Sequence, residues 1–167
     1  MNYKIANFLI IILPFCASGI GRCAAPIQLA ESSRTKYVIT LAVNASAPEK
    51  NAAAELSIYL HDITGAEFTI TNPQSASPQM VIAVGPGALK AIMPALSLEK
   101  SKLGDDGIIM KSSGSNIILT GAVGSKRGTL YAVYTFLEDI CGVRWWTSNE
   151  ISQMPSFICV IKRIANN

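Results

Sequence analysis

Apolar and polar positions along the chain follow two periods, one typical of strands and one typical of helices. Runs rich in β-branched and aromatic residues predict strands at 36–41, 67–71, 79–84, 108–111, 117–120, 143–146 and 157–161. The run 79–84 is almost wholly apolar, which is typical of a strand buried on both faces. The runs 108–111 and 117–120 are joined by a short Gly/Ser loop, so they predict a hairpin.

Two longer stretches have apolar residues at helical spacing and predict the main helices. The first follows Ser46, a residue type that caps helix N-termini, and stops at Gly65, as many helices do at a C-terminal glycine. The second covers 128–140. A short helix is predicted within 88–98, where Pro94 interrupts it. The order of the elements predicts an α/β fold (an α+β sandwich), with a mixed β-sheet and the two main helices packed on one face.

The first residues have the layout of a secretory signal peptide, which is expected over 1–19. Lys4 supplies a positive charge, 5–15 is almost wholly apolar, and 17–19 offers small residues at the cleavage position. The apolar run is short for a membrane span, which needs about 20 residues, and an uncleaved anchor is the alternative. The mature protein is therefore expected to be secreted or periplasmic, with membrane contact only through this segment.

Lipidation of this segment is not expected. Cys16 follows Phe15, and Cys23 follows Arg22. A lipoprotein signal instead has small residues directly before its cysteine, so neither position fits.

The remaining chain divides into three parts. Residues 20–35 are small and polar without periodicity, which predicts a loose linker. Residues 36–156 contain the predicted sheet and helices and form the single expected domain. Residues 157–167 are a short tail whose arbitrary composition favours a truncated product.

The composition is that of a globular domain and not of a nucleic-acid binder. Of the 167 residues, 50% are hydrophobic and 15% are charged, which is enough apolar material for a packed core. The net charge is +3, and the lysines and arginines are scattered along the chain. Because nucleic-acid binding needs clustered positive charge, no nucleic-acid partner is expected.

The sequence contains none of the common catalytic or metal-binding patterns. His61 is the only histidine and no CxxC pair occurs, so no metal site is expected. Neither GxSxG nor HExxH occurs. Asp105 and Asp106 are neighbours between two glycines, which predicts a solvated turn rather than a pair of catalytic carboxylates. No catalytic residue and no cofactor is therefore predicted.

The loop 121–128 is rich in glycine, and it joins a predicted strand to a predicted helix. Backbone N–H groups in such a loop can hold an anion. The loop has neither the GKS or GKT ending of a P-loop nor the GxGxxG spacing of a dinucleotide site. We interpret it as a tight strand-to-helix turn, with an anion site as the alternative.

Arg144, Trp145 and Trp146 form the most unusual local feature. A tryptophan beside an arginine is suited to stacking on sugar rings or to anchoring an interface. In a strand, Trp145 and Trp146 are expected to face opposite sides, so that one of them packs into the core under the helices. For the other, an interface and plain core packing remain open.

Two segments resemble the N-terminal domain of α-glucuronidase-like (family 67) glycoside hydrolases, which is related to the N-terminal domain of β-hexosaminidases. The first is the helix segment 52–65, AAAELSIYLHDITG, and the second is 127–146, RGTLYAVYTFLEDICGVRWW. The turn 104–107 and the predicted hairpin between them also match. The resemblance covers about 36–156, which is nearly all of the chain that follows the signal and linker.

The resemblance implies a mixed sheet with two helices on one face, packed against a catalytic (β/α)₈ barrel. Such a barrel carries the catalytic carboxylates and needs about 250 residues, whereas few residues follow the predicted domain. The expected function is therefore a non-catalytic accessory domain of a secreted glycan-degrading hydrolase, here without its barrel. The alternative is a stand-alone module that binds carbohydrate or docks on a partner chain.

The resemblance transfers no catalytic residue to this chain. It does include Arg127, Arg144, Trp145 and Trp146, which lie in the second motif. They are the candidate interface or sugar-stacking residues, with a structural or interdomain role implied by the family.

Overall fold

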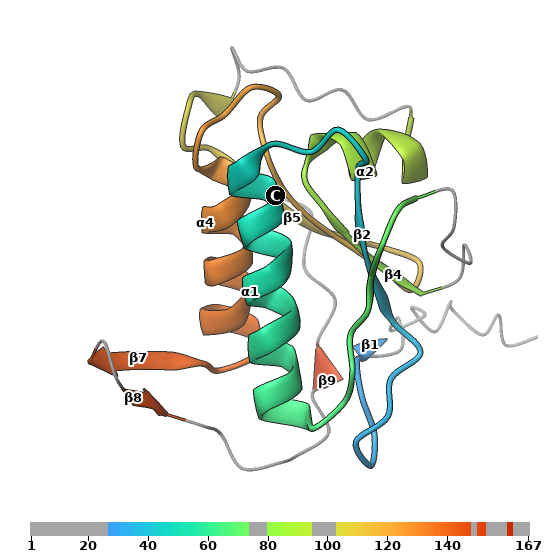
Figure 1. Cartoon of the computed structure of the whole chain (residues 1–167), viewed down its shortest axis with the longest axis vertical. Coiled ribbons are helices and arrows are strands. Elements are labelled where there is room, and N and C mark those ends of the chain that lie inside the picture. Colours follow the sequence, from blue (N-terminus) through green and yellow to red (C-terminus); the bar gives the residue numbers. More distant parts are fainter. Residues whose placement is uncertain (1–26, 74–79, 95–102, 148–149, 153–159, 162–167) are drawn as a thin grey trace, which may run out of the picture.

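The computed structural model describes residues 27–73, 80–94, 103–147, 150–152 and 160–161. Its centre is a five-stranded sheet with the strand order β3-β2-β4-β6-β5 (Figure 1). The strands are β2 (Val38–Leu41), β3 (Ile70–Thr71), β4 (Val81–Val84), β5 (Ile108–Ser113) and β6 (Asn116–Gly121). Neighbouring strands are parallel, except that β5 runs antiparallel to β6. The predicted mixed sheet and hairpin are confirmed.

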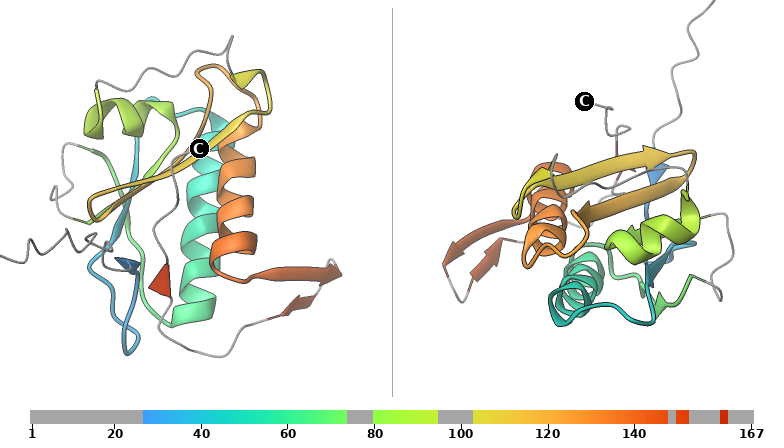
Figure 2. Two further views of the ribbon diagram at one scale, coloured as in Figure 1. Left: turned by 180° about the vertical axis from the view of Figure 1, so that it is seen from behind. Right: turned by 90° about the horizontal axis from the view of Figure 1, so that it is seen from above.

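Helices cover both faces of this sheet (Figure 2). They are α1 (Ala47–Thr64), α2 (Pro86–Ile92) and α4 (Gly128–Thr135). On β4, Ile82 and Val84 belong to the core under α1 and α4, whereas Ala83 packs against α2 on the opposite face. Every residue of β4 is buried as a result, as predicted. The two main helices do lie on one face, and α2 adds a smaller cover to the other.

The ends of α1 are formed as the sequence predicts. Ser46 precedes the helix, and its backbone N–H donates to the Glu49 carboxylate at 2.7 Å. Gly65 ends the helix with φ 68°, and its N–H donates to the carbonyl oxygen of His61 at 2.7 Å. A positive φ of this kind strains any residue with a Cβ, which explains why glycine stands there.

The second main helix changes its geometry in its last turn. After α4 the chain continues as a π-helical segment, η1 (Phe136–Ile140), so the predicted helix over 128–140 is confirmed in extent. The N–H of Cys141 donates to the carbonyl oxygen of Phe136, five residues earlier. Gly142 then turns the chain at φ 77°.

Several strands differ from their predicted ranges by one or two residues at an end, and β3 and α2 differ for reasons that the structure shows. β3 comprises two residues instead of the five predicted over 67–71, because the Phe68 carbonyl oxygen accepts a hydrogen bond from Ser57 of α1 instead of joining the sheet. α2 begins at Pro86, two residues before the predicted start, because proline is well tolerated in a first helical turn. It ends before Pro94, as expected.

The predicted strand over 143–146 forms outside the main sheet. β7 (Arg144–Thr147) pairs antiparallel with β8 (Glu150–Ser152) in a separate two-stranded ribbon. The ribbon projects from the ends of the helix pair, away from the five-stranded sheet (Figures 1 and 2). The positive φ of Gly142 redirects the chain at this point, so β7 does not return to the sheet edge.

The expected linker over 20–35 is, from residue 27 on, part of the folded domain. β1 (Ile27–Gln28) pairs antiparallel with β9 (Val160–Ile161), and the side chains of Leu29 and Ala30 are only 1% and 5% exposed. The hydroxyl of Thr35 donates to the Leu29 carbonyl oxygen at 2.6 Å and holds the segment in a tight hairpin. A loose linker is therefore wrong for this part.

Other predictions fall wholly or partly outside the described residues. These are the signal peptide over 1–19, the first part of the linker, and most of the strand and tail over 157–167, of which β9 is described. No helix in the described ranges is long and apolar enough to cross a membrane.

Candidate interdomain site

The glycine-rich loop 121–128 joins β6 to α4 through contacts that only glycine permits. A Cβ on Gly121 would lie 2.7 Å from the Cα of Gly128, and a Cβ on Gly128 would lie 2.8 Å from the carbonyl oxygen of Gly107. The N–H of Gly121 donates to the hydroxyl of buried Thr129 at 3.1 Å. The end of β6, the start of α4 and the turn before β5 therefore meet without room for side chains.

Ser125 closes this loop. Its hydroxyl accepts a hydrogen bond from the Gly128 N–H at 2.8 Å and donates to the carbonyl oxygen of Asp105 at 2.5 Å. The first N–H of α4 is thus bonded within the loop. This is the geometry of a tight strand-to-helix turn, which the sequence favours over an anion site.

Arg127 lies at the exposed start of α4. Its Nε is 3.8 Å from the Asp106 carboxylate, and its guanidinium lies 5.9 Å from the centre of the Tyr131 ring. The side chains of Arg127 and Asp106 are 65% and 59% exposed, so solvent screens their attraction. Asp106 is occupied in a surface pair, as expected for a solvated turn.

Arg144 acts at the other end of the same helix. Its Nη1 donates to the carbonyl oxygen of Glu138 at 2.6 Å and to that of Val143 at 2.9 Å. The last carbonyl groups of a helix have no partners within it, and a basic side chain stabilises them by charge and hydrogen bonding. Arg144 therefore fixes the start of β7 to the end of the helix.

Trp145 packs between the two main helices with its ring half-buried. Its ring centre lies 5.5 Å from that of Tyr59 on α1 and 5.4 Å from that of Tyr134 on α4, and both contacts are T-shaped. Its indole N–H donates to the Tyr59 hydroxyl at 3.1 Å. Aromatic contacts of this geometry add about 0.5–1.5 kcal/mol each beyond the buried area. Trp145 thus joins the outer edge of the core.

Tyr134 links this contact to Glu55 of α1. Burial raises the pKa of the Tyr134 phenol above its ordinary value of 10.0, and the negative charge of Glu55, which also accepts a hydrogen bond from Tyr134, raises it further. The charge and the hydrogen bond both favour the protonated phenol.

The structure does not bring the sequence-predicted site residues together. Arg127 precedes α4, whereas Arg144 and Trp145 follow η1, so they are about 20 Å apart along the helix. Trp146 lies in β7, but its side chain is outside what the structure describes. Arg144 and Trp145 alone share one location, the base of the β7–β8 ribbon.

At the carboxyl edge of the sheet, the Glu49 carboxylate lies at the position where open α/β sheets often bind phosphates. That position lies between β2 and β4, because the helices that follow these strands cover opposite faces. A Cβ on Gly85 would lie 3.2 Å from the Glu49 carboxylate carbon, so the carboxylate covers the start of α2. A phosphate group placed there would be repelled.

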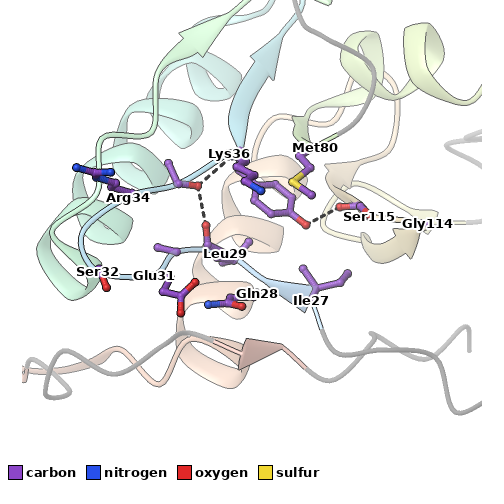
Figure 3. A pocket seen from close by; sticks show the side chains of 13 residues that line it. Ile27, Gln28, Leu29, Glu31, Ser32, Arg34, Lys36, Met80, Gly114 and Ser115 are labelled. Atoms are coloured by element: carbon purple, nitrogen blue, oxygen red, sulfur yellow. Dashed lines mark hydrogen bonds between the residues drawn. The ribbon is translucent and has the colours of Figure 1, made fainter.

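A groove of about 710 Å³ lies at the opposite, amino edge of the sheet (Figure 3). Tyr37, Met80 and Ser115 directly precede β2, β4 and β6, and together with the segment 27–36 and Gly114 they line it. The Tyr37 hydroxyl donates to the Ser115 carbonyl oxygen at 2.8 Å, and burial raises the Tyr37 pKa. The sequence does not predict this groove, because most of its lining residues fall on the supposed linker.

The described residues contain no group of three or more His, Cys, Asp or Glu side chains placed to hold a metal ion. No curated protein matches the chain. Residues 25–136, which are more than half of the chain, match the protein family described as "Glycosyl hydrolase family 67 N-terminus". The match covers the first six strands, the helices α1, α2 and α4, and the glycine-rich loop between β6 and α4. The chain therefore belongs to the family of N-terminal domains of glycosyl hydrolase family 67.

Proposed function

We propose that this chain is the non-catalytic accessory domain of a secreted, glycan-degrading hydrolase of the α-glucuronidase type, and that it stabilises a catalytic (β/α)₈ barrel. The observation that carries the proposal is the family match over 25–136, which covers nearly all of the described sheet and its helices. An N-terminal domain of a hydrolase associates with the catalytic part of that enzyme.

The contacts of the candidate residues support a role in structure rather than in chemistry. Arg144 bonds helix carbonyl groups, Trp145 packs on two tyrosines, and Arg127 pairs with Asp106 at the surface. Glycoside hydrolysis needs two carboxyl groups about 5–10 Å apart at one sugar. The acidic residues named above serve turns, a helix cap and a tyrosine instead.

Export is the second part of the proposal. Lys4 and the apolar run 5–15 support a signal peptide over 1–19, which would deliver the domain to the periplasm or the medium. Mass spectrometry of the mature protein tests this part directly. A mature chain beginning at residue 20 is expected, and an intact Met1 in the cytoplasmic fraction would contradict export.

The accessory role is tested by adding the purified chain to a family 67 barrel produced without its N-terminal domain. We expect no hydrolysis of an aryl glucuronide by the chain alone, and a higher melting temperature of the barrel in its presence. Hydrolysis by the chain alone, with a heat-treated sample inactive, would show that the domain is itself an enzyme. An unchanged melting temperature of the barrel in the presence of the chain would contradict the accessory role.

One observation favours a second function, carbohydrate binding. The groove at the amino edge has a volume in the range of ligand sites, and its rim carries Arg34 and Lys36. Titration with neutral and acidic oligosaccharides, followed by nuclear magnetic resonance, decides between the two functions. Saturable shifts confined to residues 27–37 would support carbohydrate binding, and no shift at millimolar sugar would rule it out.

A further inference from the structure

The short helix α2 covers its face of the sheet with few contacts. Of the described helices, it alone lies on that face, opposite α1 and α4 (Figure 2). Its buried side chains, Ala88 and Leu89, pack on Ala83 of β4 and Ile118 of β6. These four residues form a small apolar cluster that is separate from the main core beneath α1 and α4. Because α2 buries little apolar area, little free energy holds it on the sheet.

Thr40 of β2 lies on the same face of the sheet. It is paired in register with Ala83, whereas its neighbour Ile39 belongs to the main core on the other face. The start of α2 lies directly on this end of β2, because a Cβ on Gly87 would be 2.6 Å from the Cβ of Ala42. Thr40 itself is 0% exposed, so water does not reach its side chain while α2 is in place.

The hydroxyl of Thr40 has no hydrogen-bond partner within the part of the chain that the structure describes. Thr120 of β6 is also 0% exposed and lies on the same face, two residues after Ile118, but its hydroxyl donates to the Gly121 carbonyl oxygen at 2.9 Å. A buried hydroxyl without a partner has lost its hydrogen bonds to water and gained none, which destabilises the closed structure. Any opening that lets water reach Thr40 removes this penalty.

We propose that α2 is a cover that opens as a unit while the main core stays folded, and that the unpartnered hydroxyl of Thr40 favours this opening. When α2 leaves the sheet, it loses mainly the contacts of Ala88 and Leu89, and water hydrates the Thr40 hydroxyl. The opened face presents Thr40, Ala83 and Ile118, which form one row across β2, β4 and β6. No catalytic domain takes part, so this opening is independent of the proposed function.

Amide hydrogen exchange of the full chain, resolved by residue with nuclear magnetic resonance, tests the opening. The reporters in α2 are the N–H groups of Leu89 and Met93, which donate to the carbonyl oxygens of Gly85 and Leu89 at 3.1 and 2.7 Å. The references are the N–H groups of Leu56 and Leu60 in α1, whose side chains are buried in the main core. After correction for intrinsic rates, we expect the α2 protons to exchange at least about a hundredfold faster, because the α1 protons exchange only when the whole domain unfolds.

Two threonine variants test the part played by the hydroxyl. Thr40→Val keeps the shape of the side chain but removes the unpartnered hydroxyl from the closed structure, so the α2 protons should exchange roughly tenfold more slowly. Thr120→Val is the matched control, since it makes the same change at a buried threonine on the same face whose hydroxyl is already bonded. In this control the α2 protons should exchange at an unchanged or higher rate. Circular dichroism establishes that both variants are folded.

Three results would overturn the proposal. If the α2 protons exchange as slowly as those of Leu56 and Leu60, α2 opens only when the whole domain unfolds. If they exchange faster but Thr40→Val leaves their rates unchanged, α2 frays without uncovering Thr40. If Thr120→Val slows them as much as Thr40→Val does, the added apolar surface, and not the missing hydrogen bond, holds the cover closed.

Discussion

The indole N–H of Trp145 donates to the hydroxyl of Tyr59 at 3.1 Å and so connects residues 86 positions apart in sequence. The contact ties the first strand after the second main helix to the last turns of the first. Tyr134 closes the group from α4, with its ring at a right angle to the indole. This aromatic group lies at the start of β7, so it couples the packing of the two main helices to the direction of the ribbon.

Removal of the Tyr59 hydroxyl tests this coupling. Tyr59→Phe keeps the ring contact but leaves the half-buried indole N–H without its acceptor, which costs about 1 kcal/mol of unfolding free energy. Urea unfolding followed by circular dichroism measures the loss. Tyr131→Phe is the matched control, because that ring is 37% exposed and a surface change of this kind costs less than about 0.5 kcal/mol. Equal unfolding free energies of the two variants would mean that water replaces the Tyr59 hydroxyl as the acceptor for the indole N–H.

The junction of β6 and α4 is expected to reject any side chain at Gly128. In Gly128→Ala, the new Cβ would lie 2.7 Å from the Ser125 hydroxyl and 2.8 Å from the Gly107 carbonyl oxygen, so the backbone must shift. We expect a loss of about 1–3 kcal/mol, as for other overpacked sites. Val123→Ala in the same loop serves as control, since that side chain is exposed. A Gly128→Ala domain as stable as the wild type would show that the loop adapts freely.

The unfolding free energy is expected to fall above pH 10, in part because of Tyr134. Its folded-state pKa is raised above 10.0, so the phenol keeps its proton in the folded protein at a pH at which the unfolded chain has lost it. The stabilisation is therefore fully present below pH 10 and is lost as the pH rises through the raised pKa. Tyr134→Phe should lower stability at neutral pH, where the bond to Glu55 is lost, and flatten the decline above pH 10. Urea midpoints between pH 8 and 11 measure both effects. If the midpoint of Tyr134→Phe fell with pH as steeply as that of the wild type, Tyr134 would not contribute to the decline.

Local signals account for the elements that the sequence predicts well. Ser46, Glu49 and Gly65 each act within one helical turn of the α1 ends, so their meaning does not depend on the rest of the fold. The apolar composition of β4 likewise predicts its burial without information from other segments. The hairpin is set by the two-residue turn between β5 and β6.

What the sequence does not predict depends on partners that are distant along the chain. The strand pattern at 143–146 shows that β7 is extended but not that it pairs with β8 rather than with the sheet. The indole of Trp145 finds Tyr59 only because α1 and α4 lie side by side. The groove is assembled from three separate segments, of which Met80 alone represents one, and no local pattern marks such a surface.

Leu29 provides the sharpest test of where the folded domain begins. The sequence places it in a loose linker, whereas the structure buries its side chain, which is 1% exposed, in the core that includes Tyr37 and Phe136. Leu29→Ala should therefore cost about 2–5 kcal/mol, the usual loss for a large-to-small change in a packed core. Gln28→Ala is the neighbouring control, because that side chain is exposed and its change should cost less than about 0.5 kcal/mol. Urea unfolding of both variants gives the comparison, with circular dichroism to establish that each is folded at the start. A residue in a loose linker would tolerate the change. Equal urea midpoints for the two variants would therefore show that residues 27–35 do not pack into the domain core. A large loss confined to Leu29→Ala would establish that the groove wall belongs to the domain core.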